Sequence, residues 1–247
     1  MDVVDLREFY ASPLGQASRR LIARRIRSRW SDLNGATVLG IGYATPYLDL
    51  FRQEARAVIG FMPAEQGVIH WPFEGPSATA LVDEVDLPIL DSSVDFVLVV
   101  HGLELTDHLS DMLKEIWRVL APQGRALLVV PNRQGVWARF DSTPFGHGRP
   151  FSQLQLTQML REANFSPLGW SHALFVPPLQ RSYLVRSAPA WERLGIWLSR
   201  GFSGVILVEA IKQVYAISSG KRVKKLVPSL KPALGVRPIL QPRDRQV

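Results

Sequence analysis

Residues 94–130 read VDFVLVVHGLELTDHLSDMLKEIWRVLAPQGRALLVV, and this stretch decides the fold. It opens with the most apolar of the strand-like segments, VDFVLVV, and closes with a second one, RALLVV. Both have the length and composition of buried β-strands. Between them, apolar residues such as Met112 and Ile116 recur at helical spacing, which predicts an amphipathic helix over residues 109–120. Strand, helix and strand in this order predict a parallel β-α-β unit.

The same alternation extends in both directions from this unit. Further strands are predicted at residues 36–42, 57–61, 80–82, 165–174 and 204–216, and helices at 13–30, 47–56 and 152–163. The last two strands are not separated by a full crossover helix, although a short one could lie at residues 189–198. We therefore predict an α/β fold, Rossmann-like and doubly wound. Its seven-stranded sheet is mostly parallel, with an antiparallel edge strand and helices on both faces.

Net charge divides the chain into a neutral body and a basic tail. We expect an N-terminal helical segment at residues 1–35, the α/β domain at 36–216 and a tail at 217–247. The tail holds eight basic residues and one acid, which gives 8 − 1 = +7 and accounts for the whole net charge of +7. Its four prolines favour irregular structure. It is either a solubilising extension or a tether for an anionic partner such as RNA, lipid or an acidic protein.

Composition excludes several classes of protein. The chain has no cysteine, so disulfides and thiolate metal sites are excluded. The histidines show no metal-ligand spacing, and no metal is expected. The first ten residues carry two acids within the first five and lack the apolar core of a signal peptide. No apolar run is long enough for a transmembrane segment, so a cytoplasmic protein is expected. The arginines of residues 13–30 are either a solvated helix face or a nucleic-acid site.

Four motifs resemble one enzyme family. They are DEVDLPILDSSVD at residues 83–95, HGLE at 101–104, EIWRVLAPQGR at 115–125 and ANF at 163–165. In this order they resemble the class I S-adenosylmethionine-dependent methyltransferases, specifically the type 11 group. With its connecting segments the resemblance covers somewhat over half of the chain. It implies the Rossmann-like fold and S-adenosylmethionine as cofactor.

The resemblance implies that the loop after the first strand wraps the methionine end of the cofactor. Small residues are needed there because the backbone approaches the ligand closely. The loop reads GIGYATP from Gly40 to Pro46, and the resemblance assigns Gly40, Gly42, Tyr43 and Ala44 to cofactor binding. The family pattern, acid-x-Gly-x-Gly-x-Gly, is kept at Gly42 only. Gly40 stands where an acid is common, and Ala44 and Pro46 replace two glycines.

The resemblance also assigns the adenosine contacts. An acid that binds the ribose hydroxyls usually ends the second strand, but here Met62 occupies that position and Glu65 lies three residues on. Losing this acceptor costs on the order of 1–3 kcal/mol, which weakens binding about tenfold to a hundredfold. Asp83 matches the acid that accepts from the adenine amino group, and the backbone of Glu84 would meet a ring nitrogen. Both are alternatively surface acids.

Three regions could hold the methyl acceptor, namely the loop at His101, residues 131–137 and residues 143–150. His101 follows the fourth strand and is either a general base or part of the cofactor pocket. His147 lies between two glycines in a loop that is either a lid or a connector. The other candidate substrate residues are Tyr10, Asn132, Trp137 and Arg149. Residues 70–73 supply aromatics that either line the adenine site or pack in the core.

The sequence supports methyl transfer to an unidentified small-molecule or macromolecular acceptor. Departures at Gly40, Ala44, Pro46 and Met62 leave open a non-catalytic, methyltransferase-like subunit that binds or regulates a protein partner. A nicotinamide-dependent oxidoreductase would share the Gly-Ile-Gly start but lacks the third glycine and the ribose acid. A nucleic-acid-binding module would depend on the basic tail.

Overall fold

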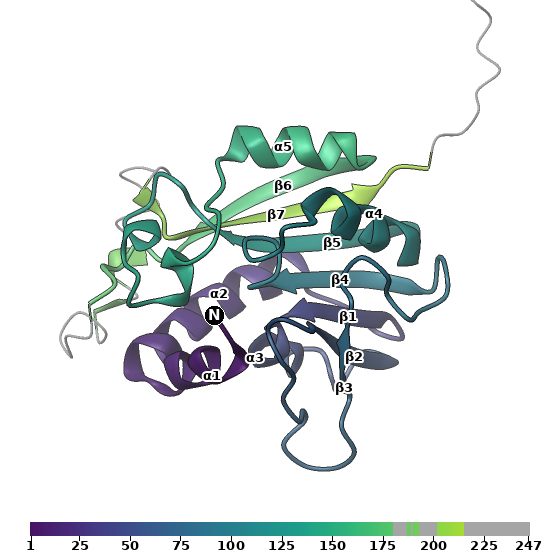
Figure 1. Ribbon diagram of the computed structural model, residues 1–247, viewed down its shortest axis with the longest axis horizontal. Helices are drawn as coiled ribbons and strands as arrows, with labels where there is room; N and C mark the ends of the chain where they lie inside the picture. Colours follow the sequence, from purple (N-terminus) through teal and green to yellow (C-terminus); the bar gives the residue numbers. More distant parts are fainter. Residues whose placement is uncertain (180–186, 189, 193–201, 215–247) are drawn as a thin grey trace, which may run out of the picture. The chain divides into compact units, whose positions relative to one another are not determined.

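The computed structural model describes residues 1–179, 187–188, 190–192 and 202–214. They contain a seven-stranded sheet whose strand order is β3-β2-β1-β4-β5-β7-β6 (Figure 1). The strands are β1 (Thr37–Gly42), β2 (Ala57–Pro63), β3 (Thr79–Val82), β4 (Val94–Val100), β5 (Leu120–Pro131), β6 (Phe165–Ala173) and β7 (Val205–Lys212).

The sheet confirms the predicted fold class. β1 pairs in parallel with β2 and β4, β2 pairs in parallel with β3, and β4 pairs in parallel with β5. β7 runs antiparallel to both of its neighbours, β5 and β6. The antiparallel strand therefore lies between β5 and β6, one position in from the edge, and β6 forms the edge itself.

Helices cover both faces of the sheet, as predicted. Val99 and Val100 are consecutive residues of β4 and point to opposite faces, so they belong to two separate apolar clusters. One cluster includes Met112 and Leu156 from the helices α4 and α5, and the other includes Ile22 from α2. The helices are α1 (Val3–Ala11), α2 (Pro13–Arg29), α3 (Thr45–Leu48), α4 (Leu109–Val119) and α5 (Gln153–Glu162), with short 3₁₀ turns η1 (Trp137–Arg139) and η2 (Pro144–Gly146).

The N-terminal segment folds into two consecutive helices, of which only α2 was predicted as a helix. Asp2 caps α1 by accepting from the backbone N–H groups of Val4 and Asp5. Ser12 ends α1 and caps α2 by accepting from the Gly15 N–H. A Cβ atom on Gly15 would lie 1.9 Å from the Phe9 carbonyl oxygen, so glycine permits the tight turn that folds α1 back beside α2.

The predicted helix over residues 47–56 is wrong beyond its first two residues. α3 ends at Leu48, and the chain continues in turns whose N–H groups bond three residues back, such as Leu50 to Tyr47 and Glu54 to Phe51. These tighter turns bury the Phe51 side chain against Trp30, the residue at the C-terminal end of α2, with ring centroids 5.9 Å apart. Tertiary packing therefore overrides the local helical pattern.

Four arginines of α2 form ion pairs with the body of the domain, which favours a structural, solvated face over a nucleic-acid site. The pairs are Arg19 with Asp49, Arg25 with Glu192, Arg27 with Glu54 and Arg29 with Glu209. In the part of the chain that the structure describes, no helix has both the length and the apolarity to cross a membrane. The predicted helix at 189–198 falls largely outside the described residues, and the predicted tail at 217–247 falls wholly outside them.

Candidate functional site

A small cavity lies at the carboxyl edge of the sheet. Its walls come from the segments that directly follow β2, β3 and β4, where ligands bind in open parallel sheets. The cavity has a volume of about 110 Å³ and is partly open to solvent. Its polar lining residues are Glu65, Gln66, Glu84, His101 and Thr106, and Met1, Pro63, Gly102 and Leu105 complete it.

Gly42 is the preserved glycine of the loop after β1, which the resemblance assigns to the cofactor and which is called the cofactor loop below. It has a conformation that only glycine adopts freely. Its φ is +77°, in the left-handed region, and it ends β1. A Cβ atom on Gly42 would lie 2.4 Å from the Val100 carbonyl oxygen and 2.9 Å from that of His101. The loop after β1 therefore lies directly against the loop after β4.

The departures from the family pattern fill space inside the protein. A Cβ atom on Gly40 would lie 2.8 Å from the side chains of Ala44 and Leu48, so Gly40 and Ala44 pack against one another beneath the loop. Met62 is fully buried in the apolar core and does not line the cavity. Glu65, three residues after Met62, does line it.

The two acids after β3 play different parts. Asp83 accepts a hydrogen bond from the Val85 N–H at 3.0 Å, within its own turn, and does not line the cavity. Glu84 lines the cavity and accepts from the Thr106 hydroxyl at 2.9 Å. The side chain of Glu84, rather than that of Asp83, is therefore available to a ligand in this cavity.

Gln66 connects the cavity to the N-terminal helix. Its side-chain N–H donates to the His101 carbonyl oxygen at 2.7 Å, and its own backbone carbonyl accepts from the Val3 N–H at 2.8 Å. Its side-chain oxygen Oε1 is buried and has no hydrogen-bond partner among the residues that the structure describes. A buried acceptor without a donor is costly, so this atom is suited to an incoming hydrogen-bond donor.

His101 lies at the centre of a buried chain of hydrogen bonds. Its Nδ1 is 3.2 Å from Glu104 Oε1, and its Nε2 is 2.9 Å from the Tyr10 hydroxyl. The Tyr10 hydroxyl is also 3.0 Å from the Tyr47 hydroxyl. The four residues come from the loop after β4, from α1 and from α3, and all are buried.

Aromatic rings fill the space beside His101. The Tyr10 ring stacks on Tyr43, with centroids 5.6 Å apart, and meets Tyr47 edge-on at 6.1 Å. The Phe145 ring packs against the His101 ring, with ring centroids 4.9 Å apart. Burial raises the pKa of Tyr10, Tyr43 and Tyr47, so the three phenols are protonated at neutral pH and each can donate a hydrogen bond.

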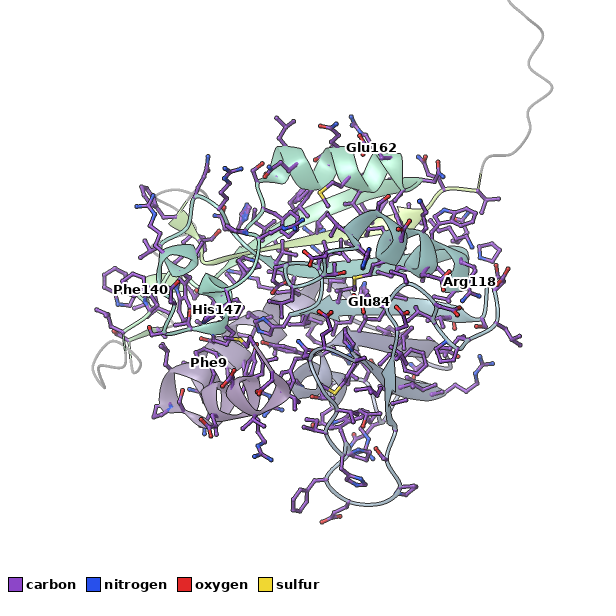
Figure 2. All side chains as sticks on the ribbon, viewed as in Figure 1. Phe9, Glu84, Arg118, Phe140, His147 and Glu162 are labelled. Atoms are coloured by element: carbon purple, nitrogen blue, oxygen red, sulfur yellow. The ribbon has the colours of Figure 1, made fainter. Side chains whose placement is uncertain are left out.

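The structure does not bring the two candidate catalytic histidines together. His147 has its Nε2 2.7 Å from the Asp141 carbonyl oxygen and lines a separate groove of about 570 Å³ between α1 and η2. Asp5 and Glu8 line the same groove, and Figure 2 shows His147 beside Phe9. A catalytic role for His147 stays a prediction.

The other candidate substrate residues are scattered. Asn132 donates to the Ser203 carbonyl oxygen at 2.9 Å, and the Trp137 indole N–H donates to the Val176 carbonyl oxygen at 2.7 Å. Both side chains are buried, and neither lines the cavity. Arg149 is exposed and pairs with Asp107. Their contact with a substrate stays a prediction.

The aromatics of residues 70–73 do not line the cavity. Phe73 is 95% exposed, and His70 bonds the Gly75 carbonyl oxygen within its own loop. Trp71 is buried in the apolar core beneath Arg52. Among the described residues, no group of three or more His, Asp or Glu side chains is placed to hold a metal ion.

The doubly wound sheet, with a carboxylate-lined cavity at its carboxyl edge, defines a Rossmann-like α/β class of protein. Within that class, residues 14–168 match the family model of the methyltransferase domain, so the chain belongs to the methyltransferase domain family. A curated relative from Mycolicibacterium smegmatis, described as a probable S-adenosylmethionine-dependent methyltransferase, is 34% identical over 138 residues. The match covers 53% of this chain and 52% of the relative, so the chain spans about half of that relative's length.

Solved structures share the fold. A SAM-dependent methyltransferase from Thermotoga maritima superposes with a TM-score of 0.60 at 16% identity, covering 85% of this chain and 96% of the other. The [4+2]-cyclase SpnF superposes with a TM-score of 0.56 at 22% identity, covering 81% of this chain and 83% of the other. At these identities the likeness shows the fold alone.

Proposed function

We propose that this protein is an S-adenosylmethionine-dependent methyltransferase that binds the adenosine part of the donor in the cavity at the carboxyl edge. The chemistry of the cavity's polar groups carries the proposal. Glu65, Glu84 and Gln66 Oε1 are all hydrogen-bond acceptors, and within the described part of the chain Gln66 Oε1 has no donor. The ribose hydroxyls and the adenine amino group are donors, so the two sets are complementary.

The bound donor supplies an electrophilic methyl group, and the residues of this chain hold and orient the reactants. Glu65 would accept from the ribose hydroxyls, and Glu84 from the adenine amino group. Gly42 brings the β1 loop against the backbone of His101, so the methionine end would lie beside this histidine. Alignment of donor and acceptor accounts for much of the catalysis in such a displacement.

The cavity must enlarge before it can hold the whole donor. Pockets for ligands of this size have volumes of about 300–1,000 Å³, whereas this one has about 110 Å³. Met1 lines the cavity, and α1 is fastened to Gln66 through the Val3 N–H. We therefore infer that the start of α1 moves when the donor binds.

Calorimetry with S-adenosylhomocysteine tests the proposal. We expect measurable binding to the intact chain and a loss of about tenfold or more in Glu84→Gln, because hydrogen bonds to charged groups contribute about 1.5–3 kcal/mol. Glu74→Gln is the matched control, since Glu74 is exposed on the loop between β2 and β3. Equal affinity in the wild type and Glu84→Gln would refute the placement of the adenine.

One observation favours a second candidate, a non-catalytic methyltransferase-like subunit. The side chains of Tyr10, Tyr43 and Tyr47 fill the space beside the cofactor loop and are bonded or stacked to one another. A protein that had lost the donor would need no open pocket there. Absence of any heat with S-adenosylmethionine at high micromolar concentration would support this candidate over the enzyme.

A further inference from the structure

With a neutral imidazole on His101 and an ionised Glu104, one arrangement of protons satisfies the chain of hydrogen bonds around His101. The Glu104 carboxylate can only accept a hydrogen bond, so the proton between these two residues lies on His101 Nδ1. His101 Nε2 then carries a lone pair, and the Tyr10 hydroxyl donates to it. The Tyr10 oxygen in turn accepts from the Tyr47 hydroxyl. In this arrangement His101 already accepts a hydrogen bond from a phenol.

The backbone of His101 is held in an unfavourable conformation. Its φ is +49°, in the left-handed region, which residues other than glycine seldom adopt. The Gln66 side chain donates to its carbonyl oxygen and thereby helps to hold it. Such strain persists only where the surroundings impose it, and it gathers at functional sites. The imidazole lies between the Tyr10 hydroxyl and Glu104.

The slot that holds the Tyr10 ring is shaped for a phenol. Tyr43 stacks on the ring at an interplanar angle of 22°, and Tyr47 meets it at 88°. At the hydroxyl end, the slot offers one acceptor on His101 and one donor on Tyr47. His101 also lines the cavity assigned to the donor, so one residue borders both spaces.

We propose that the methyl acceptor is a phenol, that His101 is its general base, and that Tyr10 occupies the acceptor's place in the free protein. This inference rests on the proposed function. The acceptor would enter as α1 withdraws, and its hydroxyl would replace that of Tyr10 on His101. Glu104 is then a positioning residue, because it fixes the proton on Nδ1 and stabilises the imidazolium that forms.

The reaction balances as a single displacement. The phenol O–H gives its proton to His101 Nε2, while the oxygen lone pair forms a bond to the methyl carbon. The carbon–sulfur bond breaks, and its electron pair stays on sulfur as the thioether. The products are an aryl methyl ether, the demethylated donor and a protonated His101, which afterwards releases its proton to water.

Truncating Tyr10 tests the slot without any catalysis. Tyr10→Ala removes the ring, and phenol itself is the probe, with toluene as the matched compound without a hydroxyl. We expect phenol to bind this variant at least about threefold more tightly than toluene, from one net hydrogen bond. The preference should fall in the double variant with His101→Leu, which keeps only the Tyr47 hydroxyl as a partner for the phenol. Equal binding of phenol and toluene to Tyr10→Ala would overturn the inference.

Nitrogen-15 NMR of the wild type and Tyr10→Phe tests the base even if Tyr10→Ala does not fold. We expect a protonated Nδ1 and an unprotonated Nε2 for His101 at neutral pH, with the Nε2 resonance shifting in Tyr10→Phe. A proton on Nε2 in the wild type would make His101 the donor to Tyr10. That result would overturn the assignment of His101 as base.

Turnover then tests the acceptor class, with 4-nitrophenol and catechol as probes. We expect methylation of these phenols, a fall in kcat of about a hundredfold or more in His101→Gln, and unchanged kcat in His108→Gln, an exposed histidine. Affinity for S-adenosylhomocysteine should change less than about threefold in His101→Gln. A chain that binds S-adenosylhomocysteine but neither binds nor methylates phenols would refute this inference and leave the proposed function standing.

The Glu104→Gln variant distinguishes a role of Glu104 in positioning His101 from a purely structural role. We expect the acid limb of the kcat–pH profile to move to lower pH, because no carboxylate then stabilises the imidazolium. Groups on other elements that face His101 are Tyr10 and Tyr47, and Glu65 and Glu84 share the adjoining cavity. All four are retained in this variant. A fall in kcat with an unmoved profile would contradict the role assigned to Glu104.

Discussion

Replacing Gly42 by alanine tests how closely the cofactor loop and the β4 loop are joined. The left-handed conformation costs a residue with a Cβ atom about 1–2 kcal/mol. The new Cβ atom would also lie 2.4 Å from the Val100 carbonyl oxygen, and backbone cannot yield as a flexible side chain can. Overpacking of this kind costs about 1–3 kcal/mol. Together the two effects destabilise the fold by roughly 2–5 kcal/mol.

Thermal denaturation measures this loss. For a domain of this size, each kcal/mol lowers Tm by about 2–4 °C, so Gly42→Ala should melt roughly 4–20 °C below the wild type. Gly35→Ala is a matched control, because Gly35 has φ +71° and no atom lies within 4 Å of its added Cβ. Only the conformational cost applies to Gly35. If the two variants melted at the same temperature, the added Cβ atom of Gly42→Ala would not be overpacked against the loop after β4, and the close contact between the two loops would be refuted.

Three further predictions follow from particular contacts. Val3→Pro removes the backbone N–H that bonds the Gln66 carbonyl, and proline is tolerated at this first position of the helix. We expect S-adenosylhomocysteine to associate about twofold to tenfold faster with this variant in stopped-flow measurements. The control Val3→Ala keeps the N–H and should bind at the wild-type rate. Arg118 holds the pKa of Glu115 below its ordinary value of 4.5. The stability that this pair contributes is therefore complete above that pH and is lost as the pH falls. In denaturant titrations from pH 7 to 3, the free energy of unfolding should decline less steeply in Glu115→Gln than in the wild type. Trp30→Phe deletes the indole N–H that donates to the buried Glu209 carboxylate at 3.2 Å. Urea titrations should show a free energy of unfolding lower by about 1–3 kcal/mol. An unchanged midpoint would show that Arg29 and Arg125 alone satisfy this carboxylate.

The sheet could be predicted from the sequence because each strand and helix carries its own local pattern. The segment from β4 through β5 shows this best, since strand, amphipathic helix and strand follow one another without interruption. α1 has a weaker signal, the short capping pair of Asp2 and Asp5, and was not predicted as a helix. The helix expected over 47–56 failed because burial of Phe51 favours turns there.

The candidate site could be predicted only in part. The family resemblance pointed to His101, Gly42 and the backbone of Glu84, which lie at the ends of β4, β1 and β3 at one edge of the sheet. The contact of His101 with Tyr10 joins residues 91 positions apart, and no local pattern encodes it. The parts of Gln66 and Tyr47 were missed for the same reason, whereas Glu104 lies within the HGLE motif, three residues after His101, and its contact is local. Gln66 in particular matters through one unpartnered oxygen, which only the folded chain reveals.

A crystal structure of the intact chain with S-adenosylhomocysteine tests the cavity most directly. We predict that adenine contacts the Glu84 carboxylate, that the ribose contacts Glu65, and that Met1 and the Gln66 side chain shift to admit the ligand. Ligand density in the groove beside His147, or none at millimolar concentration, would contradict the assignment of this cavity to the methyl donor.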